Sequence, residues 1–157
     1  MQYAKISHKI FIIKKIFLFC RKIILLIMSD KLKLEMEFPI HASPSMIFQY
    51  LTTPSGLSAW FADDVNSRGK IYTFIWDGSE ERAKVATKKD NERVKYKWLD
   101  ENDKETGTFV EFKIVVDELT KDVSLLVTDF CDNDEEEETR MLWENQIGDL
   151  KHVIGAV

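Results

Sequence analysis

Two short helices in tandem are the feature that most constrains the fold of this chain. Ser43 and Thr53 are each followed directly by a proline, Pro44 and Pro54. A hydroxyl side chain just before a helix accepts a hydrogen bond from an amide of the first turn. Proline fits the next position because its missing N–H would have no partner there. The pattern therefore predicts two helices, one opening at Pro44 and the other at Pro54.

Strand-like segments lie on both sides of this helix pair. Apolar and charged residues alternate over Leu32–Phe38, which predicts a strand with one face in water. Further strands are predicted at 71–76, 83–87, 93–99, 108–116 and 123–130, separated by short segments of turn residues. Asp77-Gly78 is the strongest turn signal, because a two-residue hairpin requires positive φ and glycine tolerates it. Connections this short favour antiparallel neighbours.

One amphipathic helix ends the chain. We expect it to begin at about Asp134 with Asp132, Asn133 or Asp134 as its cap, and Glu135–Glu138 place negative charge at the positive end of the helix dipole. Gly155 would end the helix. The apolar stripe of this helix consists of Trp143, Ile147, Leu150 and Ile154. The expected order is therefore β-α-α-β(5–6)-α, an α+β fold.

The helix pair contains a longer motif, a proline-led helix, then Leu-Thr-Thr-Pro-Ser-Gly-Leu at 51–57, then Trp60-Phe61. This motif resembles the opening signature of the START-like superfamily, also known as helix-grip or SRPBCC proteins. Within that superfamily it is similar to bacterial proteins related to the activator of the heat-shock-protein-90 ATPase. The resemblance implies a curved antiparallel sheet wrapped around a long C-terminal helix, with an apolar cavity between them. It implies no single function, because members include lipid carriers, cyclases of aromatic polyketides and chaperone activators.

Charge divides the chain near residue 28. Residues 1–27 contain six basic side chains and no acidic one, so residues 28–157 contain 16 basic and 27 acidic side chains, a net charge of −11. We expect one START-like domain over 28–157 and a basic, apolar leader over 1–27 that is not part of the fold. The longest uninterrupted apolar run of the leader has six residues, whereas a membrane span needs about 20. A membrane-associated segment and a secretion signal are the open alternatives for the leader.

Cysteine content bears on location. Cys131 is the only cysteine within 28–157, so no disulfide can form inside the expected domain. This favours a reducing, cytoplasmic setting.

Aromatic residues dominate the candidate site. We expect a small-ligand pocket between the sheet and the last helix, lined by Trp60, Phe61, Trp76, Tyr96, Trp98, Phe112, Trp143 and Ile147. Ligand pockets are typically apolar with a few polar tips, which the Tyr96 hydroxyl and the indole N–H groups would supply. Because the set contains almost no charge, we expect binding to depend little on salt. The open alternative is that these rings simply fill the core.

Other kinds of chemistry find no support, and we predict no catalytic residue, metal site or cofactor. The histidines are scattered and the domain has no cysteine pair, so zinc-ligand spacing is absent from the sequence. The acidic run Asp129–Glu138 lacks the glycine and the final glutamate of a calcium loop. No glycine-rich phosphate loop occurs, and the net charge of −11 opposes nucleic-acid binding.

Three function classes remain. Binding of a small apolar ligand ranks first, a protein-interaction domain of the chaperone-activator kind second, and an enzyme of the cyclase or hydratase type third. An enzyme would need an acid or base directed into the pocket, and Tyr96 is the one inward candidate named from the sequence. The ranking therefore favours a binding protein whose partners are a small apolar molecule or another protein, and not a membrane.

Overall fold

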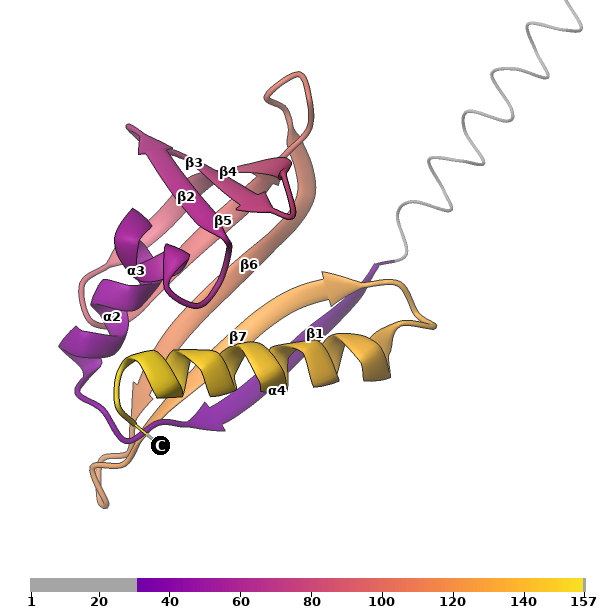
Figure 1. Ribbon diagram of the computed structural model, residues 1–157. Coiled ribbons are helices and arrows are strands. Elements are labelled where there is room, and N and C mark those ends of the chain that lie inside the picture. The colour runs from indigo at the N-terminus through magenta and orange to yellow at the C-terminus, as the bar shows by residue number, and fades with distance from the viewer. Residues whose placement is uncertain (1–30, 157) are drawn as a thin grey trace, which may run out of the picture.

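The computed structural model describes residues 31–156, and the expected leader, residues 1–27, lies outside the described part. The elements follow one another as β1 (Leu32–Pro39), α2 (Pro44–Thr52), α3 (Pro54–Ser58), β2 (Asp64–Arg68), β3 (Ile71–Trp76), β4 (Ser79–Lys89), β5 (Arg93–Leu99), β6 (Glu105–Val116), β7 (Val123–Cys131) and α4 (Glu136–Val153). Figure 1 shows α4 lying along β7 and β1, with α2 and α3 on the same side of the sheet. The predicted element order and the α+β helix-grip architecture are confirmed.

Both predicted helix caps are present. The Ser43 hydroxyl accepts a hydrogen bond from the Met46 amide at 3.3 Å, and the Thr53 hydroxyl accepts one from the Gly56 amide at 3.0 Å. Gly56 lies directly against α2, because a Cβ added to it would stand 2.7 Å from the Gln49 carbonyl oxygen. The glycine of the motif therefore permits the close approach of α3 to α2.

The strands form one sheet of seven antiparallel strands in the order β1-β7-β6-β5-β4-β3-β2. The predicted two-residue turn between β3 and β4 is confirmed, since Trp76 pairs with Ser79 while Asp77 and Gly78 have φ of 51° and 80°. Strand β2 was not predicted. Its sequence, Asp-Val-Asn-Ser-Arg, buries only the valine and so carries no alternation of apolar residues.

The C-terminal helix differs from the prediction at its start and agrees with it further on. Helix α4 begins at Glu136, and Glu135 in the cap position makes no side-chain capping bond, so the predicted start near Asp134 is wrong. A turn precedes the helix instead, with the Glu135 amide donating to the Asp132 carbonyl at 3.0 Å. Gly155 has φ of 70° and ends the helix as predicted. The predicted apolar stripe is confirmed, because Trp143, Ile147 and Leu150 are buried and Ile154 is partly buried.

Side chains fill the space between the sheet and the helices. Tyr96, Phe74 and Phe112 are the largest side chains that are fully buried there. The described part therefore has a packed interior where the resemblance implied a hollow one. A groove at one end of the sheet brings several of the predicted aromatic residues to an open space.

A candidate ligand-binding groove

This groove opens between α4 and the ends of strands β3, β4 and β5. It has a volume of about 360 Å³ and is lined by Phe61, Trp76, Glu81, Trp98, Val110, Asp129, Leu142, Trp143 and Gln146. We call it the aromatic groove. Its volume lies within the range of small-molecule sites, about 300–1,000 Å³. The groove is therefore large enough for one small molecule.

Two neighbouring hollows extend the aromatic groove. One, of about 450 Å³, shares Glu81, Trp98 and Asp129 with it and continues toward Lys31. The other, of about 550 Å³, shares Phe61, Trp76 and Gln146 with it and continues toward His152. The shared lining residues show that the three spaces adjoin one another.

The predicted site residues divide into three groups. Phe61, Trp76, Trp98 and Trp143 line the aromatic groove. Trp60 borders the hollow toward His152, and its indole N–H donates to the Tyr50 carbonyl at 3.0 Å. The remaining three, Tyr96, Phe112 and Ile147, are at most 1% exposed and lie in the packed core, so the structure does not place them on the groove. Their alternation in the sequence identified the inward face but not the depth at which each residue lies.

Phe61 is the centre around which the groove rings pack. Its ring centroid lies 5.4 Å from Trp76, nearly perpendicular to it, and 5.9 Å from Trp143, nearly parallel to it. The ring centroids of Trp76 and Trp98 lie 6.3 Å apart. These separations are typical of aromatic contacts that stabilise a packed cluster. The walls are therefore held by ring contacts, while Trp76 and Trp98 remain partly exposed to solvent.

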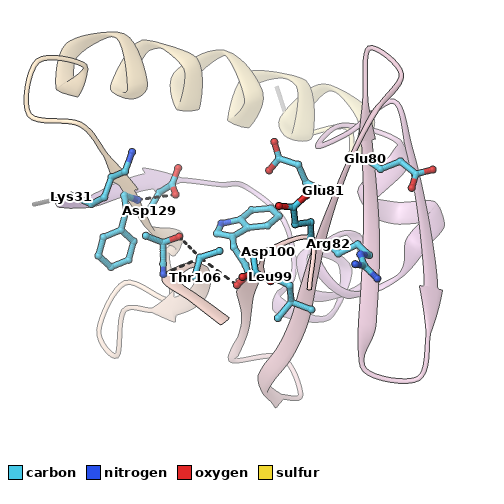
Figure 2. A pocket seen from close by; sticks show the side chains of 12 residues that line it. Lys31, Glu80, Glu81, Arg82, Leu99, Asp100, Thr106 and Asp129 are labelled. Atoms are coloured by element: carbon cyan, nitrogen blue, oxygen red, sulfur yellow. Dashed lines mark hydrogen bonds between the residues drawn. The ribbon is translucent and has the colours of Figure 1, made fainter. Parts of the chain in front are cut away.

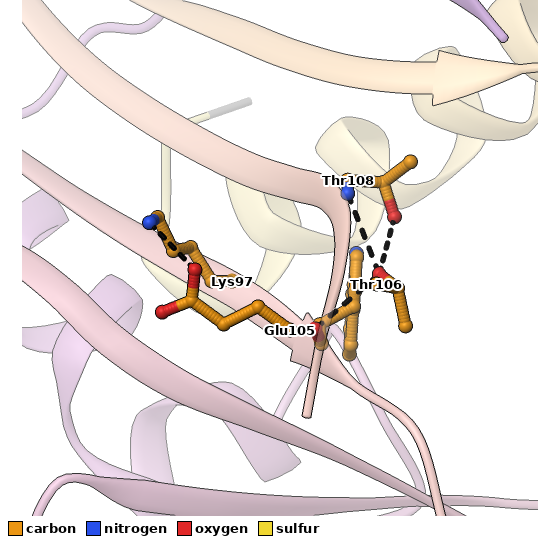
Figure 3. Close-up of polar contacts among 5 residues, drawn as sticks. Lys97, Glu105, Thr106 and Thr108 are labelled. Atoms are coloured by element: carbon orange, nitrogen blue, oxygen red, sulfur yellow. Dashed lines mark hydrogen bonds and ion pairs between the residues drawn. The ribbon is translucent and has the colours of Figure 1, made fainter. Parts of the chain in front are cut away.

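The pairing of β5 with β6 is irregular at Trp98. The register of the pair shifts between Lys97 and Leu99, which leaves Trp98 without a regular ladder partner on β6. The Thr106 hydroxyl donates to the Trp98 carbonyl at 3.3 Å and lies 3.0 Å from the Thr108 hydroxyl, as Figure 3 shows. On the other side, the Lys97 ammonium group contacts the Glu105 carboxylate at 2.8 Å. A side-chain hydrogen bond from Thr106 thus links the Trp98 backbone to β6 at this irregularity.

The predicted polar tips of the pocket are largely used inside the protein. The Tyr96 hydroxyl donates to the Leu51 carbonyl at 2.8 Å and is buried, so the expectation that it faces a ligand is wrong. The Trp76 indole donates to the Phe61 carbonyl at 2.8 Å, and the Trp143 indole donates to Asp129 Oδ2 at 2.9 Å. Two of the three groove indoles therefore already have partners for their N–H groups.

Asp129 is the groove residue that the sequence interpretation missed. Burial raises the pKa of its carboxyl group, and the hydrogen bonds from the Trp143 indole and the Phe130 amide oppose that rise. A signal was present, because Leu125, Val127 and Cys131 occupy alternate positions on β7 and are buried. An aspartate in phase with those residues points inward, under α4.

Glu81 is the second carboxylate of the groove. It pairs with the buried Phe74 across β3 and β4, so it shares the inward face of the sheet, but it lies at the exposed end. Figure 2 shows Glu81 and Asp129 on either side of the hollow that adjoins the groove. The expectation that the site holds almost no charge is therefore wrong.

Residues 31–156 also bear on other kinds of site. No group of three His, Cys, Asp or Glu side chains in this range is arranged to hold a metal ion. None of the helices in this range is long and apolar enough to cross a membrane.

Comparison with protein families matches residues 28–156 to the START-like superfamily domain. The chain belongs to the START-like superfamily. The resemblance predicted from the helix pair is thus confirmed. START-like domains are known for ligand binding and for protein interaction. No curated protein matches the chain significantly.

Several solved structures share the fold of this chain. The solution structure of the Aha1 dimer from Colwellia psychrerythraea has a TM-score of 0.66 at 22% identity, covering 78% of this chain and 96% of that one. A protein from Bacteroides fragilis has a TM-score of 0.56 at 29% identity, covering 78% and 90%. A protein from Mesorhizobium loti has a TM-score of 0.63 at 17% identity, covering 79% and 97%.

Proposed function

We propose that this START-like domain binds a small, largely apolar molecule in the aromatic groove. The observation that carries the proposal is the groove itself, an open space of about 360 Å³ with four aromatic side chains among its lining residues. Apolar, concave sites with a few polar groups are the usual form of small-molecule sites. The buried Cys131, the only cysteine in 28–157, is in keeping with our proposal of a cytoplasmic location.

Intrinsic fluorescence offers a direct test. Three of the four tryptophans of the chain line the groove, so a bound molecule should change their emission. Phenylbutanol is a suitable neutral probe. We expect a saturable change in emission and retention of the probe in a native mass spectrum. A linear, non-saturating response would contradict the proposal.

Neighbouring residues of α4 provide a matched pair of variants. Leu142 and Met141 are 55% and 58% exposed, but only Leu142 lines the groove. Leu142→Ser should weaken phenylbutanol binding several-fold, because apolar contact area is lost. Met141→Ser should leave binding unchanged. Equal weakening by the two substitutions would show that the probe does not bind in the groove.

Protein interaction is the alternative, and one observation favours it. Met141 and Leu142 form an exposed apolar pair on α4, and exposed apolar patches mark interaction surfaces when they are large enough. The structural relative from Colwellia psychrerythraea is a dimer. If this pair serves self-association, sedimentation should show a dimer that Met141→Ser weakens. A monomer at all concentrations would remove the self-association form of this alternative.

An enzyme is the third class, and the acid it would need is Asp129 rather than Tyr96. The raised pKa of the Asp129 carboxyl group would suit proton transfer. The two oxygens of Asp129 already accept hydrogen bonds from the Phe130 amide and the Trp143 indole. These bonds fit a role in ligand binding as well as they fit a role in catalysis. Ligand binding therefore stands ahead of catalysis.

A further inference from the structure

The charged groups of the aromatic groove are acceptors of hydrogen bonds, while the Trp98 indole N–H and the Gln146 side-chain amide supply donors. Asp129 and Glu81 are carboxylates, and the indole N–H groups of Trp76 and Trp143 are already used. Each carboxylate oxygen has two lone pairs, so Asp129 keeps acceptor capacity beyond its two bonds from the protein. A ligand with hydrogen-bond donors would complement these two carboxylates.

The charged side chains of the groove also favour a ligand that carries hydrogen-bond donors. The lining of the groove contains two carboxylates and no lysine, arginine or histidine. Two basic side chains, Lys31 and Arg82, line the adjoining hollow, and each is already in an ion pair. Lys31 lies 2.9 Å from Asp132, and Arg82 lies 2.8 Å from Asp103. The adjoining hollow also contains the acidic side chains of Glu80, Asp100 and Glu101. Within residues 31–156, neither groove carboxylate therefore forms an ion pair with a basic side chain.

The walls suit a positive charge as well. Indole is the aromatic side chain that attracts cations most strongly, through the negative potential of its ring face. Three indoles, from Trp76, Trp98 and Trp143, line the groove that contains the two carboxylates. Aromatic walls combined with carboxylates stabilise an ammonium group with an apolar substituent better than a neutral or anionic molecule.

We propose that the aromatic groove recognises a small organic cation, an ammonium group on an apolar body, with Asp129 and Glu81 as its countercharges. This inference rests on the proposed function, because it names the ligand class of the same groove. Binding of the cation would also remove the electrostatic cost of keeping Asp129 ionised in a partly buried position.

Three probes with the same apolar body separate charge from apolar contact. Phenylbutylamine, phenylbutanol and phenylbutyrate are respectively cationic, neutral and anionic at neutral pH. Titrated into the full chain and followed by tryptophan emission and calorimetry, the amine should bind at least about tenfold more tightly than the alcohol. The anion should bind more weakly than the alcohol. Added salt should weaken binding of the amine and leave that of the alcohol nearly unchanged.

Charge-removing variants locate the countercharge. Asp129→Asn and Glu81→Gln should each weaken binding of the amine several-fold, and by a clearly larger factor than they weaken binding of the alcohol. Glu81 is exposed, so Glu81→Gln tests the inference even if Asp129→Asn fails to fold. Glu118→Gln is the control, because it removes the same charge in the turn at the opposite end of β7 from Asp129. It should leave binding of both probes unchanged.

The outcomes separate this inference from the proposed function. If the amine and the alcohol bind equally well, the inference is overturned while the proposed function stands. If the amine is favoured but neither groove variant weakens it, the cation binds elsewhere and the inference is again overturned. If none of the three probes binds, the proposed function fails and the inference fails with it.

Discussion

The two ends of the concave face use similar aromatic residues in different ways. Beneath α2, the rings of Tyr72 and Tyr96 lie 5.2 Å apart, and their hydroxyls donate to the Thr52 and Leu51 carbonyls at 2.7 and 2.8 Å. Both tyrosines are buried, and burial raises the pKa of both hydroxyls. We call this the closed end of the sheet.

At the open end, which contains the aromatic groove, the rings are reached by solvent. Trp76 and Trp98 lie two residues beyond Phe74 and Tyr96 on the same strands and the same face, yet both are only partly buried. At the closed end, carbonyls of α2 accept the tyrosine hydroxyls, so polar tips can be buried there at little cost. Alternation alone therefore does not distinguish a core ring from a groove ring. The element that packs over a ring decides whether the ring belongs to the core or to the groove.

The largest expected effect comes from a charge placed in the core that both ends share. Phe112 contacts the rings of Trp60, Phe61 and Trp143 and is fully buried. Phe112→Asp should lower the free energy of unfolding by several kcal/mol, because it buries an unpaired carboxyl group. Lys113→Asp, on the exposed face of the same strand, should change it by less than about 0.5 kcal/mol. Chemical denaturation measures both, and equal tolerance would refute the packed core.

Alanine substitutions of two helical glycines should change the stability of the protein in opposite directions. Gly56→Ala, at the closed end, should destabilise by about 1–3 kcal/mol, because the new Cβ meets α2 backbone at 2.7 Å. Gly148→Ala in α4 meets nothing within 4 Å and should stabilise by up to about 1 kcal/mol, because alanine favours the helix. Thermal unfolding compares the two. A neutral Gly56→Ala would mean that α3 does not need its close approach to α2.

A pair of conservative substitutions tests the difference between the ends directly. Tyr96→Phe removes one buried hydrogen bond and should cost about 1 kcal/mol of stability without changing phenylbutanol affinity. Trp98→Phe should reduce that affinity several-fold, because it removes part of a groove wall. Chemical denaturation measures the change in stability, and fluorescence titration measures the change in phenylbutanol affinity. If Tyr96→Phe weakens binding as much as Trp98→Phe does, the closed end is part of the site.

The smallest expected effect is a pH dependence at the open end. Because the folded-state pKa of Asp129 is raised above 3.8, its contribution to stability is greatest below that pH and is lost as pH rises through the folded-state value. The free energy of unfolding of the wild type, minus that of Asp129→Asn, should therefore decrease from acid to neutral pH. Phenylbutylamine affinity should rise over the same range as Asp129 ionises, because the carboxylate then attracts the ammonium group. A difference that increases with pH would contradict the burial of this carboxyl group.

Much of the fold followed from the sequence because its signals are local. A cap and a proline act within one turn, so both helices and their starting residues were predicted at Ser43-Pro44 and Thr53-Pro54. The Asp77-Gly78 turn and the stripe headed by Trp143 are likewise written in neighbouring residues. Strand β2 was missed for the same reason, since its polar residues are held by pairing with β3 and not by an apolar pattern of their own.

The site depended on contacts between residues distant in the sequence, which only the tertiary structure decided. Periodicity places Tyr96 and Trp98 on one face of β5, but α2 covers the first while the second lines the groove beside α4. Asp129 enters the groove because β7 runs beneath α4, where the Trp143 indole meets its carboxylate. A period of two residues defines which face of a sheet a side chain occupies. Packing of helices against that face determines whether the side chain becomes core or binding surface.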